Sequence, residues 1–102
     1  MPLLKIFSRH ALRVSADVLH PPLKKIWNVP ADVLKVLVCP VHDMSGSEDI
    51  YIDVRAKAKP ERTQEVVDQA MEDMKKLFSE HGYSASIRVE LYEPRLQSAL
   101  KA

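Results

Sequence analysis

Pro2, the residue that follows the initiator methionine, is of a type that can take part in proton transfer. Once Met1 is removed, its nitrogen becomes a secondary amine on a rigid ring. Such an amine exchanges protons near neutral pH when its pKa is lowered, and both desolvation and neighbouring cations disfavour the ammonium form. The plainer interpretation is that Pro2 is simply a second residue that allows the initiator methionine to be removed. The residue alone leaves both interpretations open.

Two arginines and a glutamate are also suited to act on a small anion. Arg55 and Arg88 can each hold a carboxylate through two hydrogen bonds and stabilise the charge of a developing enolate. Glu90 can act as a general acid or activate water if its pKa is raised. The same side chains can instead form ion pairs between strands or subunits, each pair contributing at most about 1 kcal/mol. The two roles are compatible.

No pattern of cysteine and histidine indicates a metal or a nucleophile. Cys39 is the only cysteine, so an intrachain disulfide is impossible and a structural zinc site is not expected. The four histidines fit neither a triad nor a metal-ligand spacing, and His42, in a long loop, is the one best placed to approach a ligand. We therefore expect no metal site.

Length and charge limit the class of protein. We interpret residues 1–102 as a single domain, because a chain of 102 residues is too short for a second core. With 15 basic and 14 acidic side chains the formal net charge is +1, so no nucleic acid and no anionic membrane is indicated as a partner. The sequence contains no long uncharged apolar run and no recognisable leader. We expect a cytoplasmic protein.

Alternation of apolar and polar residues predicts the strands that would carry these side chains. The expected strands cover residues 2–7, 33–39, 50–55 and 87–92. The stretch 40–49 is rich in turn residues and is predicted to be a loop. The tail from residue 95 to residue 102 is expected to be weakly helical or a terminal extension.

Helical spacing of apolar residues predicts two helices. The first is expected to start near Leu19 and end at Trp27, because Pro21 and Pro22 are tolerated only in a first turn. The second is expected to begin at Pro60 and to end before a glycine at position 82 that takes the left-handed conformation. The order of elements is therefore strand, helix, strand, strand, helix, strand.

This order predicts an α/β (α+β) two-layer sandwich, a four-stranded sheet with both helices on one face. Each strand-helix-strand unit should contain parallel strands. The other face of the sheet is expected to mix charged and apolar side chains: Lys5, Lys35, Asp53, Arg55, Arg88 and Glu90 with Leu3, Phe7, Leu37, Tyr51 and Tyr92. Such a face can be exposed to solvent, but its apolar members exceed what an exposed face needs and favour packing between subunits.

Taken in this order, the parts resemble the tautomerase superfamily, particularly the members similar to macrophage migration inhibitory factor and an uncharacterised branch of small bacterial proteins. The resemblance covers the chain from about Pro2 to Pro94. Its features are Met1-Pro2 leading into the first strand, Val29-Pro30 after the first helix, the loop before the third strand, and residues 53–57 and 89–93.

The resemblance implies a homotrimer whose sheets form a central barrel, with active sites between subunits and no cofactor. It implies that Met1 is removed and that the amine of Pro2 is the base that moves a proton between the enol and keto forms of a small 2-oxo acid. Arg55 matches a strand position that lines the pocket. Arg88 and Glu90 match positions that an adjacent subunit contributes.

Two further residues are expected to bind the substrate, and the resemblance implies the first of them. Asn28 falls near a pocket lysine of the family, and it lacks that lysine's charge. Lys5 is a further cation beside the first strand. The expected substrate-binding residues are therefore Lys5, Asn28, Arg55 and Arg88.

Three functions remain compatible with the sequence. The first is a tautomerase with Pro2 as base, which requires removal of Met1. The second is a non-catalytic trimeric binding or scaffold protein that keeps the architecture without the chemistry. The third is a hydratase-like or dehalogenase-like enzyme in which Glu90 activates water.

Overall fold

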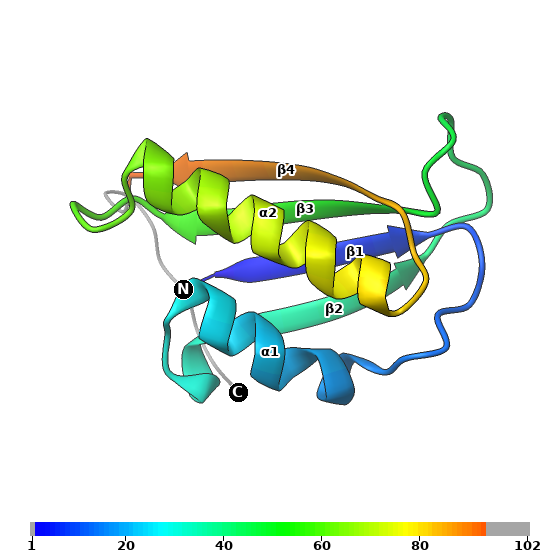
Figure 1. Ribbon diagram of the computed structural model, residues 1–102, viewed down its shortest axis with the longest axis horizontal. Helices are drawn as coiled ribbons and strands as arrows, with labels where there is room; N and C mark the ends of the chain where they lie inside the picture. Colours follow the sequence, from blue (N-terminus) through cyan, green and yellow to red (C-terminus); the bar gives the residue numbers. More distant parts are fainter. Residues whose placement is uncertain (1, 94–102) are drawn as a thin grey trace.

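The computed structural model describes residues 2–93, in which both helices cover the same face of one sheet (Figure 1). The elements follow the order β1 (Leu3–Ser8), α1 (Ala16–Trp27), the short 3-10 helix η1 (Ala31–Val33), β2 (Lys35–Pro40), β3 (Ile50–Lys57), α2 (Gln64–Glu80) and β4 (Ala85–Tyr92). The predicted fold class and its order of strands and helices are confirmed. Met1 and the predicted extension at 95–102 lie outside the described residues.

The sheet has the strand order β2-β1-β3-β4. β1 is parallel to β2, β3 is parallel to β4, and the two pairs meet where β1 runs antiparallel to β3. The predicted parallel pairing within each half is confirmed. Figure 1 shows that β1 and β2 begin where β3 and β4 end. Pro2, which directly precedes β1, therefore lies at the end of the sheet where β3 and β4 finish.

The core lies between the sheet and the two helices. Its fully buried side chains come from alternate positions of the central strands and from one face of each helix: Leu4, Ile6, Leu19, Leu23, Ile52, Val54, Met74 and Phe78. Burial of an aliphatic or aromatic side chain of this size stabilises the fold by about 1.5–3 kcal/mol. The indole N–H of Trp27 reaches the sulfur of Met74 at 3.4 Å and joins the two helices.

Helix α1 begins at Ala16, about one turn before the start that the sequence predicts. Ser15 is its N-cap, because the serine hydroxyl accepts a hydrogen bond from the N–H of Val18 at 3.2 Å and the serine carbonyl accepts one from Leu19 at 3.1 Å. A serine cap contributes about 1 kcal/mol. The predicted start near Leu19 is wrong because this cap fixes the helix ahead of both prolines.

Pro21 and Pro22 consequently lie inside α1. A proline cannot donate to the carbonyl four residues earlier, which here belongs to Asp17 and Val18. Both of those residues are exposed, so water can hydrate the two carbonyls. Burial of Leu23 on the opposite face of the helix helps to offset the cost of about 3 kcal/mol for an interior proline.

Helix α2 begins at Gln64, and the prediction that it starts at Pro60 is wrong. The Thr63 hydroxyl caps the helix by accepting the N–H of Val66 at 3.2 Å, while Pro60 lies in the preceding turn. Gly82 follows the helix at φ +86, as predicted from its left-handed position. Both helix starts are therefore set by a hydroxyl cap and not by a proline.

Strand β2 begins at Lys35, two residues later than predicted, because the preceding residues form η1. The N–H of Val33 donates to the carbonyl of Pro30 at 3.1 Å and closes that turn. The predicted loop between β2 and β3 is confirmed, and Arg9 anchors it by donating to the carbonyls of Gly46 and Glu48. Over residues 2–93, neither helix is long and apolar enough to cross a membrane.

Candidate functional site

Pro2 lies at the head of β1, with its side chain less than 2% exposed. Its carbonyl accepts a hydrogen bond from the backbone N–H of Lys35 at 3.1 Å. The next residue, Leu3, is paired with Lys35 on one side and with Arg55 on the other. Pro2 is therefore held at the sheet end where β1 and β2 begin and β3 finishes.

The face of the sheet that the helices leave open carries the predicted charged residues in two adjoining rows. One row across the strands is Lys35, Leu3, Arg55 and Glu90, and the next is Leu37, Lys5, Asp53 and Arg88. The fold therefore brings Lys5, Arg55, Arg88 and Glu90 onto one face, although they lie far apart in the sequence. Oδ1 of Asp53 is buried in this face without a hydrogen-bond partner among the described residues.

The two arginines of this face have different partners. Nη2 of Arg88 lies 3.8 Å from Oε2 of Glu90, and their side chains are 62% and 48% exposed. An ion pair this exposed contributes at most about 1 kcal/mol. Arg55 instead lies over an aromatic ring, with its guanidinium carbon 5.4 Å from the centre of the Tyr92 ring. The sequence places Tyr92 on the open face, but gives no signal for this pairing.

Pro2 and Arg55 project toward opposite sides of the sheet. Pro2 shares the alternation of Leu4 and is buried on the helix side, whereas Arg55 is exposed between the buried residues Val54 and Ala56. A ligand that touches both the nitrogen of Pro2 and the charged face must therefore bind at the end of the sheet, where its two sides meet.

Asn28 has a structural role at the end of α1. It is the C-cap residue, in the left-handed conformation at φ 50 and ψ 56, and its N–H donates to the carbonyl of Lys25 at 3.2 Å. Asparagine tolerates this conformation better than most residues. The capping uses its backbone, so its side chain is exposed and its predicted contact with a substrate stays a prediction.

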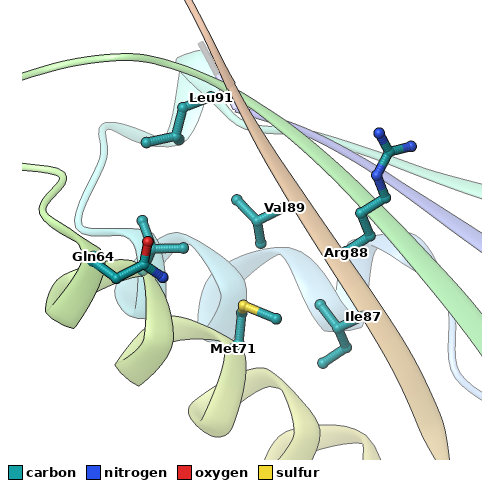
Figure 2. A pocket seen from close by; sticks show the side chains of 7 residues that line it. Gln64, Met71, Ile87, Arg88, Val89 and Leu91 are labelled. Carbon is teal, nitrogen blue, oxygen red and sulfur yellow. The ribbon is translucent and has the colours of Figure 1, made fainter.

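A separate groove of about 370 Å³ runs between α2 and the outer strand β4, lined by Gln64, Val67, Met71, Ile87, Arg88, Val89 and Leu91. Figure 2 shows the apolar side chains gathered around the groove and the guanidinium of Arg88 turned away from it. The groove does not include Pro2. The alternation of apolar residues along β4 is the signal that could have predicted it.

At the far end of the sheet, Asp49 is held by Ser84. The aspartate carboxylate accepts hydrogen bonds from the Ser84 N–H at 2.9 Å and from the Ser84 hydroxyl at 3.1 Å. These bonds hold the pKa of Asp49 below its usual 3.8. Each residue precedes one of two parallel strands, and that position is the sequence signal for the contact. Asp49 therefore fastens the starts of β3 and β4 and is no proton donor near neutral pH.

Three or more metal-ligating side chains do not cluster anywhere in the described part of the chain. The charged side chains that the fold brings onto the open face toward the Pro2 end are those of Lys5, Lys35, Asp53, Arg55, Arg88 and Glu90. These groups can bind a small anion and exchange protons with it.

Solved structures of other proteins have the same architecture. No protein-family model matches the chain, and no curated protein does. Among solved structures, a domain of unknown function from Sebaldella termitidis ATCC 33386 is 17% identical with a TM-score of 0.70, and the match covers 97% of this chain and 95% of that one. Macrophage migration inhibitory factor from Oncomelania hupensis is 14% identical with a TM-score of 0.69, covering 95% and 92%.

A third structure, 5-carboxymethyl-2-hydroxymuconate delta-isomerase, is 13% identical with a TM-score of 0.67, and the match covers 99% of this chain and 89% of that one. At these identities the likeness establishes the fold. The chain has the fold of the tautomerase superfamily, which confirms the resemblance expected from its sequence.

Proposed function

We propose that this protein is a cofactor-independent tautomerase that moves a proton between the enol and keto forms of a small 2-oxo acid. The amine of Pro2, freed by removal of Met1, is the base. The observation that carries the proposal is the position of Pro2, whose buried side chain lies at the end of the sheet where β2 begins at Lys35 and where Arg55, on the opposite side of the sheet, lies near the end of β3. The likeness to an isomerase and to macrophage migration inhibitory factor supports the reaction class.

Burial and charge tune the proposed base. The ring of Pro2 is withdrawn from water, and the side chains of Lys35 and Arg55 add positive charge at the same end of the sheet. Both effects disfavour the ammonium form and lower the pKa of the amine. The free amine accepts the proton of the enol hydroxyl as the carbonyl forms, and the resulting ammonium returns a proton to the neighbouring carbon.

The substrate carboxylate is the proposed partner of the charged face. Arg55 binds it through paired N–H donors and stabilises the enolate charge. Arg88 and Lys5 add positive charge from the adjoining row, and the amide of Asn28 donates at the edge of the pocket. Glu90 holds Arg88 in place through the contact at 3.8 Å, and it is the proposed acid for substrates that need one.

We further propose a homotrimer as the active assembly. Both outer strands carry exposed large apolar residues, namely Leu37 and Val38 on β2 and Leu91 on β4, each 36–37% exposed. An outer strand presents unpaired backbone groups to a neighbour. Pairing of β2 in one subunit with β4 in the next is a head-to-tail contact, which closes into a ring. It would bring Lys35 of one subunit toward Glu90 of the next.

The test combines mass determination with an assay of phenylenolpyruvate ketonisation. Protein from its native source should lack Met1 and accelerate the reaction, and Pro2→Ala should abolish most of that activity. Pro30→Ala is a matched control, because Pro30 is exposed and lies outside the sheet. Retention of Met1 in the native protein would rule out the proposed base.

A non-catalytic binding or scaffold protein is the second candidate. It is favoured by the closed environment of Pro2 and by the pairing of Arg88 with Glu90, which leaves that carboxylate engaged. The same pairing weighs against the hydratase-like or dehalogenase-like enzyme, which needs Glu90 free to activate water. Processed protein that binds 2-oxo acids without turning them over would support the scaffold, and release of halide or hydrated product would support the third function.

A further inference from the structure

The two arginines of the open face are not equivalent, and their surroundings assign them different roles. Arg88 has a carboxylate partner in Glu90. Arg55 is aligned with Glu90 across β3 and β4, yet among the described residues it forms no ion pair with Glu90 or with any other acid. Its neighbour is the ring of Tyr92, 5.4 Å from the guanidinium carbon.

Contact with a ring leaves the hydrogen-bonding edge of an arginine free. A guanidinium that lies over an aromatic ring is attracted through its face, while its five N–H donors project from its rim. A carboxylate binds an arginine along that rim, through two parallel hydrogen bonds. Tyr92 therefore restrains Arg55 without occupying the donors that a carboxylate needs.

The ring itself is held by the sheet. Tyr92 pairs with Lys57 at the end of β4, and its carbonyl accepts the N–H of Ala58 at 2.8 Å. Arg55 lies two residues before Lys57 on β3, so its side chain projects on the same face. Two paired strands thus fix the ring relative to the guanidinium, and they do so at the sheet end that contains Pro2.

We propose that Tyr92 is a positioning residue that holds Arg55 ready to bind a carboxylate, and that Arg55 rather than Arg88 binds the carboxylate of the ligand. The inference deepens the proposed function and rests on it for the class of ligand. Glu90, the acid aligned with Arg55, lies against Arg88 on its own strand and not against Arg55.

The test is a titration of the full chain with phenylpyruvate, followed through the Nε–H signals of its arginines by NMR. The signal of Arg55 should move on binding, and that of Arg88 should move little. Phenylpyruvate methyl ester, which lacks the negative charge, should leave both unchanged. A dominant response of Arg88 would overturn the assignment.

Substitutions then separate positioning from general stability. Tyr92→Leu should raise the Kd for phenylpyruvate about two- to fivefold and remove the ring-current shift of the Arg55 side chain. Tyr92→Phe keeps the ring and should restore both. Tyr51→Leu is the matched control, because Tyr51 lies on the same face against Phe7, at 6.2 Å between ring centres, and not against Arg55. Equal affinities for Tyr92→Leu and the parent protein would contradict the inference.

Arg55→Lys keeps the charge but loses the planar pair of donors, and it should bind phenylpyruvate more weakly than the parent protein. The same titration on Pro2→Ala distinguishes this inference from the proposed function. If protein that lacks Met1 binds phenylpyruvate at Arg55 but does not turn over phenylenolpyruvate, the inference stands and the proposed tautomerase activity is contradicted. If the protein turns over phenylenolpyruvate and the Arg55 signal does not respond to phenylpyruvate, the proposed function stands and the inference about Arg55 is contradicted.

Discussion

The carbonyl oxygen of Pro2 accepts the backbone N–H of Lys35 at 3.1 Å, which fastens the head of β1 to the start of β2. The pairing uses the carbonyl of Pro2 and leaves its nitrogen out of the sheet. A proline nitrogen has no hydrogen to donate while Met1 is attached. Removal of Met1 would therefore free an amine at a nitrogen that donates no hydrogen bond to the sheet, at the position where the fold holds Pro2.

The rate of the proposed reaction should depend on pH through this amine. Because the unprotonated amine is the base, kcat/KM should rise with pH through the pKa of Pro2 and then level off. Pro2→Ala, which replaces the ring amine with a primary one, should lower kcat about 10²- to 10⁴-fold. Steady-state kinetics with phenylenolpyruvate from pH 5 to 9 would measure this, and a rate that is flat across that range would argue against an amine base.

Asp49 should make the fold sensitive to acid. Its pKa is lowered in the folded state by the bonds from Ser84, so it stabilises the fold above the usual value of 3.8, and this contribution is lost as the pH falls through the folded pKa. Urea unfolding of Asp49→Asn should show less loss of stability below pH 4 than the parent protein. Asp32→Asn, in the exposed turn η1, is the control. Identical acid profiles for parent and Asp49→Asn would contradict this role.

Gly82, which follows α2, should tolerate a side chain poorly. Its φ is +86, and an added Cβ would lie 3.2 Å from Nη2 of Arg13. Gly82→Ala should therefore cost about 1–2 kcal/mol of the free energy of unfolding. Ser79→Ala, exposed in the last turn of the same helix, should change it by less than about 0.5 kcal/mol. Chemical denaturation would measure the free energy of unfolding of both variants. Equal stabilities of Gly82→Ala and Ser79→Ala would contradict a special requirement for glycine at position 82.

Ser15 should matter more than its exposure suggests. It caps a helix whose second turn contains two prolines, so loss of the cap removes about 1 kcal/mol from a helix that is already interrupted. Ser15→Ala should lower the unfolding midpoint in urea, and Ser15→Asp should retain it because aspartate also caps. Ser45→Ala, in the exposed β2–β3 loop, is the control. A destabilised Ser15→Asp would indicate a role other than capping.

The sequence predicts most of the fold because its strongest signals are local. Alternation along 50–55 and 87–92 is the direct consequence of a sheet with one covered face, and β3 and β4 follow it. The predicted starts of α1 and α2 are wrong because the sequence signal for them is the preference of proline for a first turn. The hydroxyls of Ser15 and Thr63 decide those starts.

The candidate site is less predictable because it depends on register between distant strands. Alternation places Arg55 and Tyr92 on the open face, but only the alignment of β3 with β4 puts one over the other. The burial of Pro2 likewise depends on tertiary packing, which no local pattern encodes. Asn28 caps α1 through its backbone because the helix ends there. The resemblance that predicts a substrate contact for Asn28 does not predict this capping role.

The account depends most directly on the state of the N-terminal amine. The decisive measurement is an NMR titration of that amine, made on protein whose mass shows whether Met1 is present. The account predicts an N-terminal proline whose pKa lies below the value of about 7.7–8.0 that is usual for α-amino groups. Retained Met1 in the native protein, or an amine that titrates at or above that value, would contradict it.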